Sequence, residues 1–294
     1  MQDEISAWSD RVTFTLGSQV QYDSVAGVDV QPTARVMWKA FPRHRVWAAT
    51  SSAVRTPSFS DRGMTISYTP IPGPFGLPLF VTVIGNPTAK TERHQDAEIG
   101  YRVAIGSSAS IDVTGFIGSY ADLRSAEPGV AVVQFAPAPQ VRIEAFLANT
   151  LRATTRGVEI AAQWSPIAAW RLDGSYTGLR LDANLAPTSL DSVDGYANGS
   201  APRHQWQLRS GFLVGSRGTL DVAFFHVGRL KFEGIDAYTR ADINAEWRAT
   251  DRVSLAITGQ NLLDGARAEY GGPNAVLLAT EMRRTIAVRA RWRF

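Results

Sequence analysis

The chain has 294 residues, of which 45% are hydrophobic and 19% charged, so it is long enough for one large β domain or two ordinary domains and too apolar to be disordered. The formal net charge of +3 provides no strongly basic surface, which argues against a nucleic-acid partner. Cysteine is absent, which excludes disulfides and thiolate chemistry, and no apolar run reaches about 18 residues, which excludes a membrane-spanning helix.

In chain order, apolar and polar residues alternate over segments of roughly 9 to 13 residues, the length of a tilted strand that crosses a bilayer. The clearest case is 237–248, where Ala241, Ile243 and Trp247 share one face and Arg240 and Glu246 share the other. A soluble β sandwich could show the same alternation. We predict about thirteen strands, near residues 2–8, 11–22, 28–40, 45–55, 92–106, 110–122, 155–165, 169–181, 203–214, 219–230, 237–248, 253–262 and 283–294.

The connections between these segments alternate between short and long. Short connections fall at residues 9–10, 42–44, 107–109, 165–168, 215–218 and 250–251. The long stretches, rich in glycine and proline, are 55–91, 123–156, 182–202 and 263–282, with 22–28 and 231–235 as shorter members of the same set. Short turns on one rim and long loops on the other are typical of outer-membrane barrels, whose short turns are periplasmic.

The tryptophans provide an independent test, because membrane barrels concentrate aromatic residues at the two interfaces. Trp206 lies near a long loop, whereas the other seven of the eight tryptophans lie close to a short turn or to the C-terminus. We expect an outward-facing girdle made of Trp8, Trp38, Trp47, Trp164, Trp170, Trp247 and Trp292. These patterns together predict an all-β fold, a transmembrane antiparallel β-barrel of the bacterial outer membrane.

Short motifs follow one another along most of the chain. Residues 46–63 read VWAATSSAVRTPSFSDRG and residues 85–102 read GNPTAKTERHQDAEIGYR. Further motifs are RGVE at 156–159 followed by Trp164, LDGSY at 172–176, PRH at 202–204, GQNLLD at 259–264 and RWRF at 291–294. In order and spacing, this set resembles the C-terminal barrel of the TonB-dependent outer-membrane receptors.

The resemblance implies a barrel of 22 strands closed by an N-terminal plug domain. Such receptors take up scarce nutrients, mostly ferric siderophores and also cobalamin, haem or glycans, with energy from the inner-membrane TonB complex. Residues 1–294 are then expected to be the C-terminal part of the barrel, about thirteen of the 22 strands, without the plug or a signal peptide, and with an unpaired edge near residues 2–8. The implied partners are outer-membrane lipid, the missing plug domain, the TonB complex through the missing N-terminal part, the barrel assembly machinery and a small-molecule substrate.

Metal-binding patterns in the sequence are weak. Haem receptors of this family place a histidine between two boxes that correspond here to Arg55-Thr56-Pro57 and Asn86-Pro87, and no histidine lies between them. His94, just beyond the second box, is interpreted as a solvated residue at the top of a strand. Asp191 and Asp194 lack the spacing of a complete calcium loop. We therefore predict no metal site and no cofactor.

Two groups of residues are candidates for binding. Loop aromatics could contact a substrate or pack the loops against each other: Phe59, Tyr68, Phe75, Phe80, Tyr196 and Tyr270. Arginines on the predicted inner face are placed towards the periplasmic end, where they would contact the plug: Arg240, Arg289, Arg291 and Arg293. Phe294 matches the family's terminal assembly signal. No Ser/His/Asp set, carboxylate pair or phosphate-binding loop points to catalysis, so no enzymatic activity is predicted.

The resemblance favours a receptor fragment for TonB-dependent uptake of a scarce nutrient, with a ferric siderophore as the expected substrate. Two alternatives stay open. One is a passive outer-membrane pore or a barrel that displays binding loops, and the other is an inactive truncated product.

Overall fold

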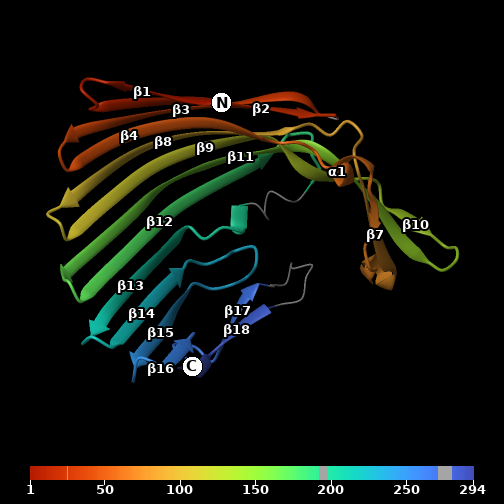
Figure 1. Ribbon diagram of the computed structural model, residues 1–294. Coiled ribbons are helices and arrows are strands. Elements are labelled where there is room, and N and C mark those ends of the chain that lie inside the picture. The colour runs from red at the N-terminus through yellow and green to blue at the C-terminus, as the bar shows by residue number, and fades with distance from the viewer. Residues whose placement is uncertain (25, 192–197, 271–279) are drawn as a thin grey trace.

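The computed structural model describes residues 1–24, 26–191, 198–270 and 280–294. Seventeen strands of this described part form one large curved sheet, and two more form a small separate sheet (Figure 1). None of the helices in the described ranges has the length and apolar character of a membrane span.

Thirteen strands of the large sheet, counted over the described residues, pair antiparallel in chain order. They coincide with the thirteen segments that alternation predicts, which confirms that prediction. These strands are β1 (Gln2–Ala7), β2 (Val12–Asp23), β3 (Gly27–Phe41), β4 (His44–Arg55), β8 (Glu92–Ile105), β9 (Ala109–Pro128), β11 (Gln140–Ile167), β12 (Trp170–Leu185), β13 (His204–Val214), β14 (Gly218–Val227), β15 (Tyr238–Arg248), β16 (Val253–Gln260) and β19 (Thr285–Trp292).

The short turns all lie at one end of the sheet and the long connections at the other, as predicted (Figure 1). The β4–β8 connection contains α1 (Phe59–Gly63), β5 (Thr65–Ser67), β6 (Ile71–Pro72), the 3-10 turn η1 (Pro74–Gly76) and β7 (Pro78–Ile84). The β9–β11 connection contains β10 (Val132–Gln134), and the β16–β19 connection contains β17 (Ala266–Tyr270) and β18 (Thr280–Arg283).

The prediction of one long loop over 123–156 is wrong. β9 continues to Pro128 and β11 begins at Gln140, and the two pair with each other along most of this stretch. β11 also pairs with β7 in parallel and with β10. The pairing with β7 and β10 satisfies backbone hydrogen bonds of β11 beyond its predicted end. The glycine and proline residues of this stretch are confined to 128–139.

The sheet has two faces of opposite character, which the strand register assigns. Polar side chains of β2, β3, β4 and β8 line the concave inner face, as do those of β12 to β16. The convex outer face carries exposed apolar residues such as Ile99, Leu208, Phe224, Ile257 and Val288. Apolar-out and polar-in is the arrangement of a membrane barrel and the reverse of a soluble sandwich.

The buried core is small and lies near the loop end. Leu151, Ala153 and Ala183 form it, with Tyr120 and Leu181 among the half-buried residues packed against it. In the described residues, β1 pairs with β2 alone in register and β19 with β16 alone. The sheet in Figure 1 is therefore an open shell with the N-terminus and the C-terminus at its two edges.

Candidate functional site

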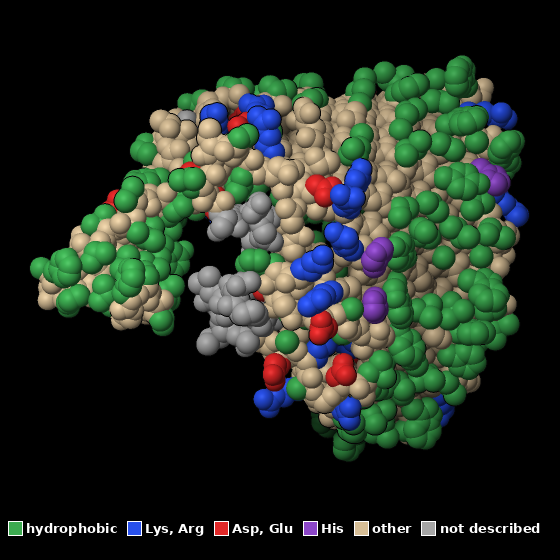
Figure 2. Space-filling model, turned by 180° about the vertical axis from the view of Figure 1, so that it is seen from behind, with side chains coloured by type: hydrophobic (Ala, Val, Ile, Leu, Met, Phe, Trp, Pro, Cys, Tyr) green, Lys and Arg blue, Asp and Glu red, His purple; other side chains and the backbone are tan. Residues whose placement is uncertain are grey.

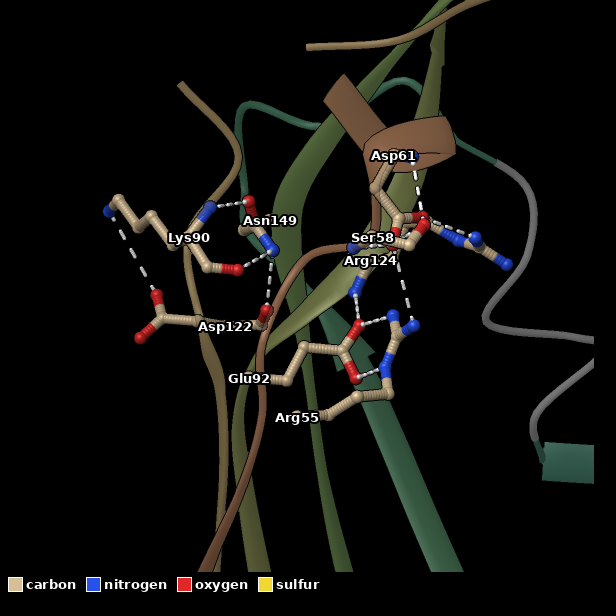
Figure 3. Close-up of polar contacts among 8 residues, drawn as sticks. All are labelled: Arg55, Ser58, Asp61, Lys90, Glu92, Asp122, Arg124 and Asn149. Atoms are coloured by element: carbon tan, nitrogen blue, oxygen red, sulfur yellow. Dashed lines mark hydrogen bonds and ion pairs between the residues drawn. The ribbon is translucent and has the colours of Figure 1, made fainter. Parts of the chain in front are cut away.

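The β4–β8 connection meets β9 and β11 through a network of polar side chains, which we call the loop junction. Figure 3 shows that its members converge from four segments of the chain. They are Arg55, Ser58, Asp61, Lys90, Glu92, Asp122, Arg124 and Asn149.

Asp61 forms the centre of the loop junction. Ser58 caps α1: its Oγ accepts from the backbone N–H of Asp61 at 3.1 Å, and its own N–H donates to Asp61 Oδ2 at 2.9 Å. Arg124 Nη1 donates to Asp61 Oδ1 at 2.7 Å, and Arg55 Nη1 lies 3.6 Å from Oδ2. The Asp61 side chain is only 6% exposed, so the cap and the arginines compensate a buried charge.

Burial alone would raise the pKa of the Asp61 carboxyl. The backbone N–H of Ser58, the Arg124 guanidinium and the Ser58 hydroxyl outweigh that effect and lower this pKa from 3.8 to about 2. Asp61 is therefore ionised at neutral pH and holds α1 on β9.

Glu92 joins the ends of β4 and β8. Arg55 is its direct partner in the strand register, and the guanidinium binds both carboxylate oxygens, with Nε to Oε2 at 2.8 Å and Nη2 to Oε1 at 2.5 Å. The backbone N–H of Arg124 donates to Oε1 at 3.0 Å. Because two parallel hydrogen bonds join the two groups, the orientation of the Arg55 guanidinium relative to the Glu92 carboxylate is fixed as well as the distance between them.

Asn149 connects β11 to the other side of the loop junction. It lies where the β9–β11 register shifts between Ala148 and Leu151. Its Oδ1 accepts from the Lys90 N–H at 2.8 Å, and its Nδ2 donates to the Asp122 carbonyl at 2.7 Å. The Asn149 side chain, which the register shift frees from the ladder, thus links β9 to the segment that precedes β8.

Two of the motifs behind the family resemblance, 46–63 and 85–102, contribute residues to this loop junction. Arg55 comes from the first box, and in the second box the Asn86 N–H donates to the Asp61 carbonyl at 2.8 Å while its Oδ1 accepts from the Thr88 N–H at 2.9 Å. Three cations, Arg55, Lys90 and Arg124, face three carboxylates, Asp61, Glu92 and Asp122, in ion pairs. A neutralised cluster of this kind positions the loop and leaves little charge for a ligand. The sequence assigned no role to these residues, although Ser58-x-x-Asp61 is a recognisable capping pattern.

The concave inner face borders an open hollow of about 1070 Å³. Hydroxyl, amide and charged groups line it, among them those of Thr15, Arg35, Ser51 and Glu98. A hollow with dispersed hydrogen-bonding groups can hold an organic solute or another protein segment.

His94 and Tyr120 form the loop-side wall of this hollow. Their rings stack with centroids 4.2 Å apart. Gly118 provides the space, because a Cβ there would lie 2.7 Å from Thr155 Oγ1 and 2.9 Å from His94 Nε2. The sequence predicts a solvated His94, whereas the structure places it half-buried against an aromatic ring.

The loop aromatics are not brought into one stack. Phe59 in α1 and Phe75 in η1 are 91% and 93% exposed, Tyr68 is exposed after β5, and Phe80 is half-buried on β7. Among the described residues none of these four makes a ring contact with another. Tyr196 and the side chain of Tyr270 lie outside the described residues.

The four arginines separate into two groups. Arg240 is the third residue of β15 after a long connection, so its predicted place near the short turns is wrong. It packs over the Phe225 ring at 4.4 Å and pairs with Asp242 at 3.1 Å. Arg289 and Arg291 lie opposite Ala256 and Ser254 at the short-turn end, and the Arg293 N–H donates to the Arg252 carbonyl at 2.8 Å.

Among the predicted girdle residues, Trp47 lies on the inner face, and its placement in an outward ring is therefore wrong. Arg35 covers its ring at 5.6 Å, and a Cβ at Gly100 would clash with it. Trp47 is as close to a short turn as a girdle residue should be. Side chains alternate between the two faces along β4, however, and the position of Trp47 in this alternation directs its side chain inward. The strand register places five of the other tryptophans on the outer face: Trp38, Trp164, Trp170, Trp247 and Trp292. Trp8 lies in the first turn. The ring of Phe294 stacks on that of Trp292, with centroids 5.6 Å apart.

A family model described as "TonB dependent receptor-like, beta-barrel" matches residues 1–262. No curated protein matches the chain. Among solved structures, the siderophore receptor PirA from Acinetobacter baumannii has a TM-score of 0.74 at 15% identity and matches 100% of this chain over 45% of its own. A mutant of the ferric enterobactin receptor PfeA from Pseudomonas aeruginosa has a TM-score of 0.75 at 14% identity, and the match covers 99% of this chain and 44% of the receptor. The copper transporter OprC has a TM-score of 0.63 at 15% identity, and the match covers 98% of this chain and 46% of the transporter. The chain thus spans less than half of each of these structures, and at such identities the likeness shows the fold.

Proposed function

Because the chain belongs to the TonB-dependent receptors, a non-enzymatic family of the bacterial outer membrane, we propose that residues 1–294 form the C-terminal part of the barrel of a receptor for a ferric siderophore. The plug domain, the TonB complex and the assembly machinery, which would recognise Phe294, are the partners that this proposal requires. The inward arginines Arg289 and Arg291 would face the plug from the short-turn end.

The observation that carries the substrate class is the chemistry of the inner hollow. Its hydroxyl and amide groups can donate to and accept from an oxygen-rich organic complex, and the stacked rings of His94 and Tyr120 provide an apolar wall at the loop side. Pockets for organic ligands combine these two features, whereas a bare metal ion is held by several side-chain donors at bonding distance.

Uptake by cells provides the test. Iron-starved cells with and without the complete protein are given labelled ferric siderophores, cobalamin and copper salts, one at a time. We expect the protein to confer uptake of a ferric siderophore, and we expect dissipation of the proton-motive force to stop it. Siderophore uptake that continues after dissipation would identify a passive pore, copper uptake would assign the substrate to a metal ion, and no uptake of any solute would indicate an inactive product.

A further inference from the structure

The outer apolar surface ends in an aromatic row on β12, β13 and β14, on the side of the long loops. Tyr176 pairs with Trp206 and Trp206 with His226 in the strand register. Trp206 stacks on His226 with centroids 5.5 Å apart, and the Tyr176 hydroxyl is 2.8 Å from His204 Nδ1. Tryptophan and tyrosine with a polar partner are typical of the level where lipid headgroups begin.

Two arginines lie directly opposite each other on the loop side of this row, two same-face positions beyond Tyr176. Arg156 of β11 is the register partner of Arg180 of β12, two residues along each strand from the pair Val158 and Gly178. Even-numbered residues of both strands face outward here, and the two side chains are 57% and 59% exposed. Figure 2 shows the broad hydrophobic surface giving way to a strip of charged and histidine side chains on the side of the loops.

This arginine pair is only partly neutralised. Asp182 accepts from Arg180 Nε at 2.9 Å and lies 3.9 Å from Arg156 Nη2, so one carboxylate serves two guanidinium groups. Like charges directly opposite on one face of a sheet are destabilising. An additional anion at this position would remove that repulsion.

We propose that Arg156 and Arg180 bind the phosphate group of a membrane lipid in the outer leaflet. Three features select this occupant. The pair is continuous with the lipid-facing surface, Arg180 lies on the loop side of the aromatic row, four residues beyond Tyr176 on β12, and guanidinium groups bind phosphate through paired hydrogen bonds. The site lies on the outer wall and is independent of the solute that passes inside.

Lipid retention by the complete protein tests the proposal. The protein is exchanged into phosphatidylcholine nanodiscs that contain lipid A with its phosphates or dephosphorylated lipid A, and native mass spectrometry counts the bound lipid. We expect the phosphorylated form to be retained and each Arg→Gln change, R156Q or R180Q, to weaken its retention about fivefold. The double variant R156K/R180K keeps both positive charges but loses the paired hydrogen bonds of the guanidinium groups. It should therefore retain more phosphorylated lipid than the Arg→Gln variants and less than the unchanged protein.

The same strand provides a matched control. Arg171 of β12 is also 59% exposed and also pairs with an aspartate two residues on, Asp173 at 2.8 Å, but it lines the inner face. R171Q should leave lipid retention unchanged, and thermal unfolding of all variants shows that each is folded. Equal retention of both lipids, an equal loss in R171Q, or displacement of the lipid by millimolar inorganic phosphate would overturn the proposal.

Discussion

Arg55 and Glu92 are direct partners at the last step of the β4–β8 ladder, and the Arg55 guanidinium also reaches Asp61 at 3.6 Å. The same arginine thus closes the ladder and fastens the helix that follows it. The strand pairing and the anchoring of the β4–β8 connection are therefore coupled through a single side chain.

Asp61→Asn should loosen the β4–β8 connection. The change removes the charge that Arg124 and Arg55 share and leaves two guanidinium groups beside a neutral amide, at a cost of roughly 2 kcal/mol. Hydrogen exchange over residues 56–91 of the complete protein measures this opening. Asp251→Asn in an exposed short turn is the control, and unchanged protection in Asp61→Asn would contradict the role of this residue.

The same connection should open on acidification. The folded pKa of Asp61 is about 2 against an ordinary value of 3.8, so its contribution is present above pH 3.8 and is lost as the pH falls towards 2. Protection factors over 56–91, corrected for intrinsic exchange, should decline across this window. In Asp61→Asn the part of the decline that is due to Asp61 should be absent. The same pH profile in the variant and in the unchanged protein would mean that other carboxylates cause the decline.

Gly118→Ala should destabilise the barrel by roughly 1–3 kcal/mol, because the added methyl has to displace Thr155 or His94. Gly115→Ala on the same strand is the control, since its nearest atom would be 3.9 Å away. Denaturant unfolding in detergent compares the two variants. Equal stability of both would mean that the inner wall yields without strain.

Tyr120→Ala should weaken ferric siderophore binding about fivefold, because it removes one ring of the inner aromatic wall. Tyr101→Ala removes a tyrosine from the outer face, where it contacts His44, and should leave binding unchanged. Equilibrium binding to the complete protein gives both values. A loss in both variants would indicate a general effect on the barrel.

The strands and the order of the turns were predictable, since a period of two is a local property of the sequence. Trp47 marks the limit of this local information. Its distance from a turn can be read from the sequence, but the face it occupies depends on the phase of the alternation along β4, which the distance does not give. The loop junction was not predictable for a different reason. Asp61 and Arg124 are far apart in the chain, and nothing near either residue specifies the partner. Residues 140–154 alternate as a strand should, but their pairing depends on β7 and β10.

β11 contains 28 residues, whereas about 9–11 are enough to cross a bilayer at the usual tilt. Well over half of this strand therefore stands outside the hydrocarbon layer, and β7 and β10 are carried on it (Figure 1). This projection is therefore a target for an antibody raised against intact cells. An epitope tag placed between Gly129 and Pro139 would report surface display from a point well clear of the membrane.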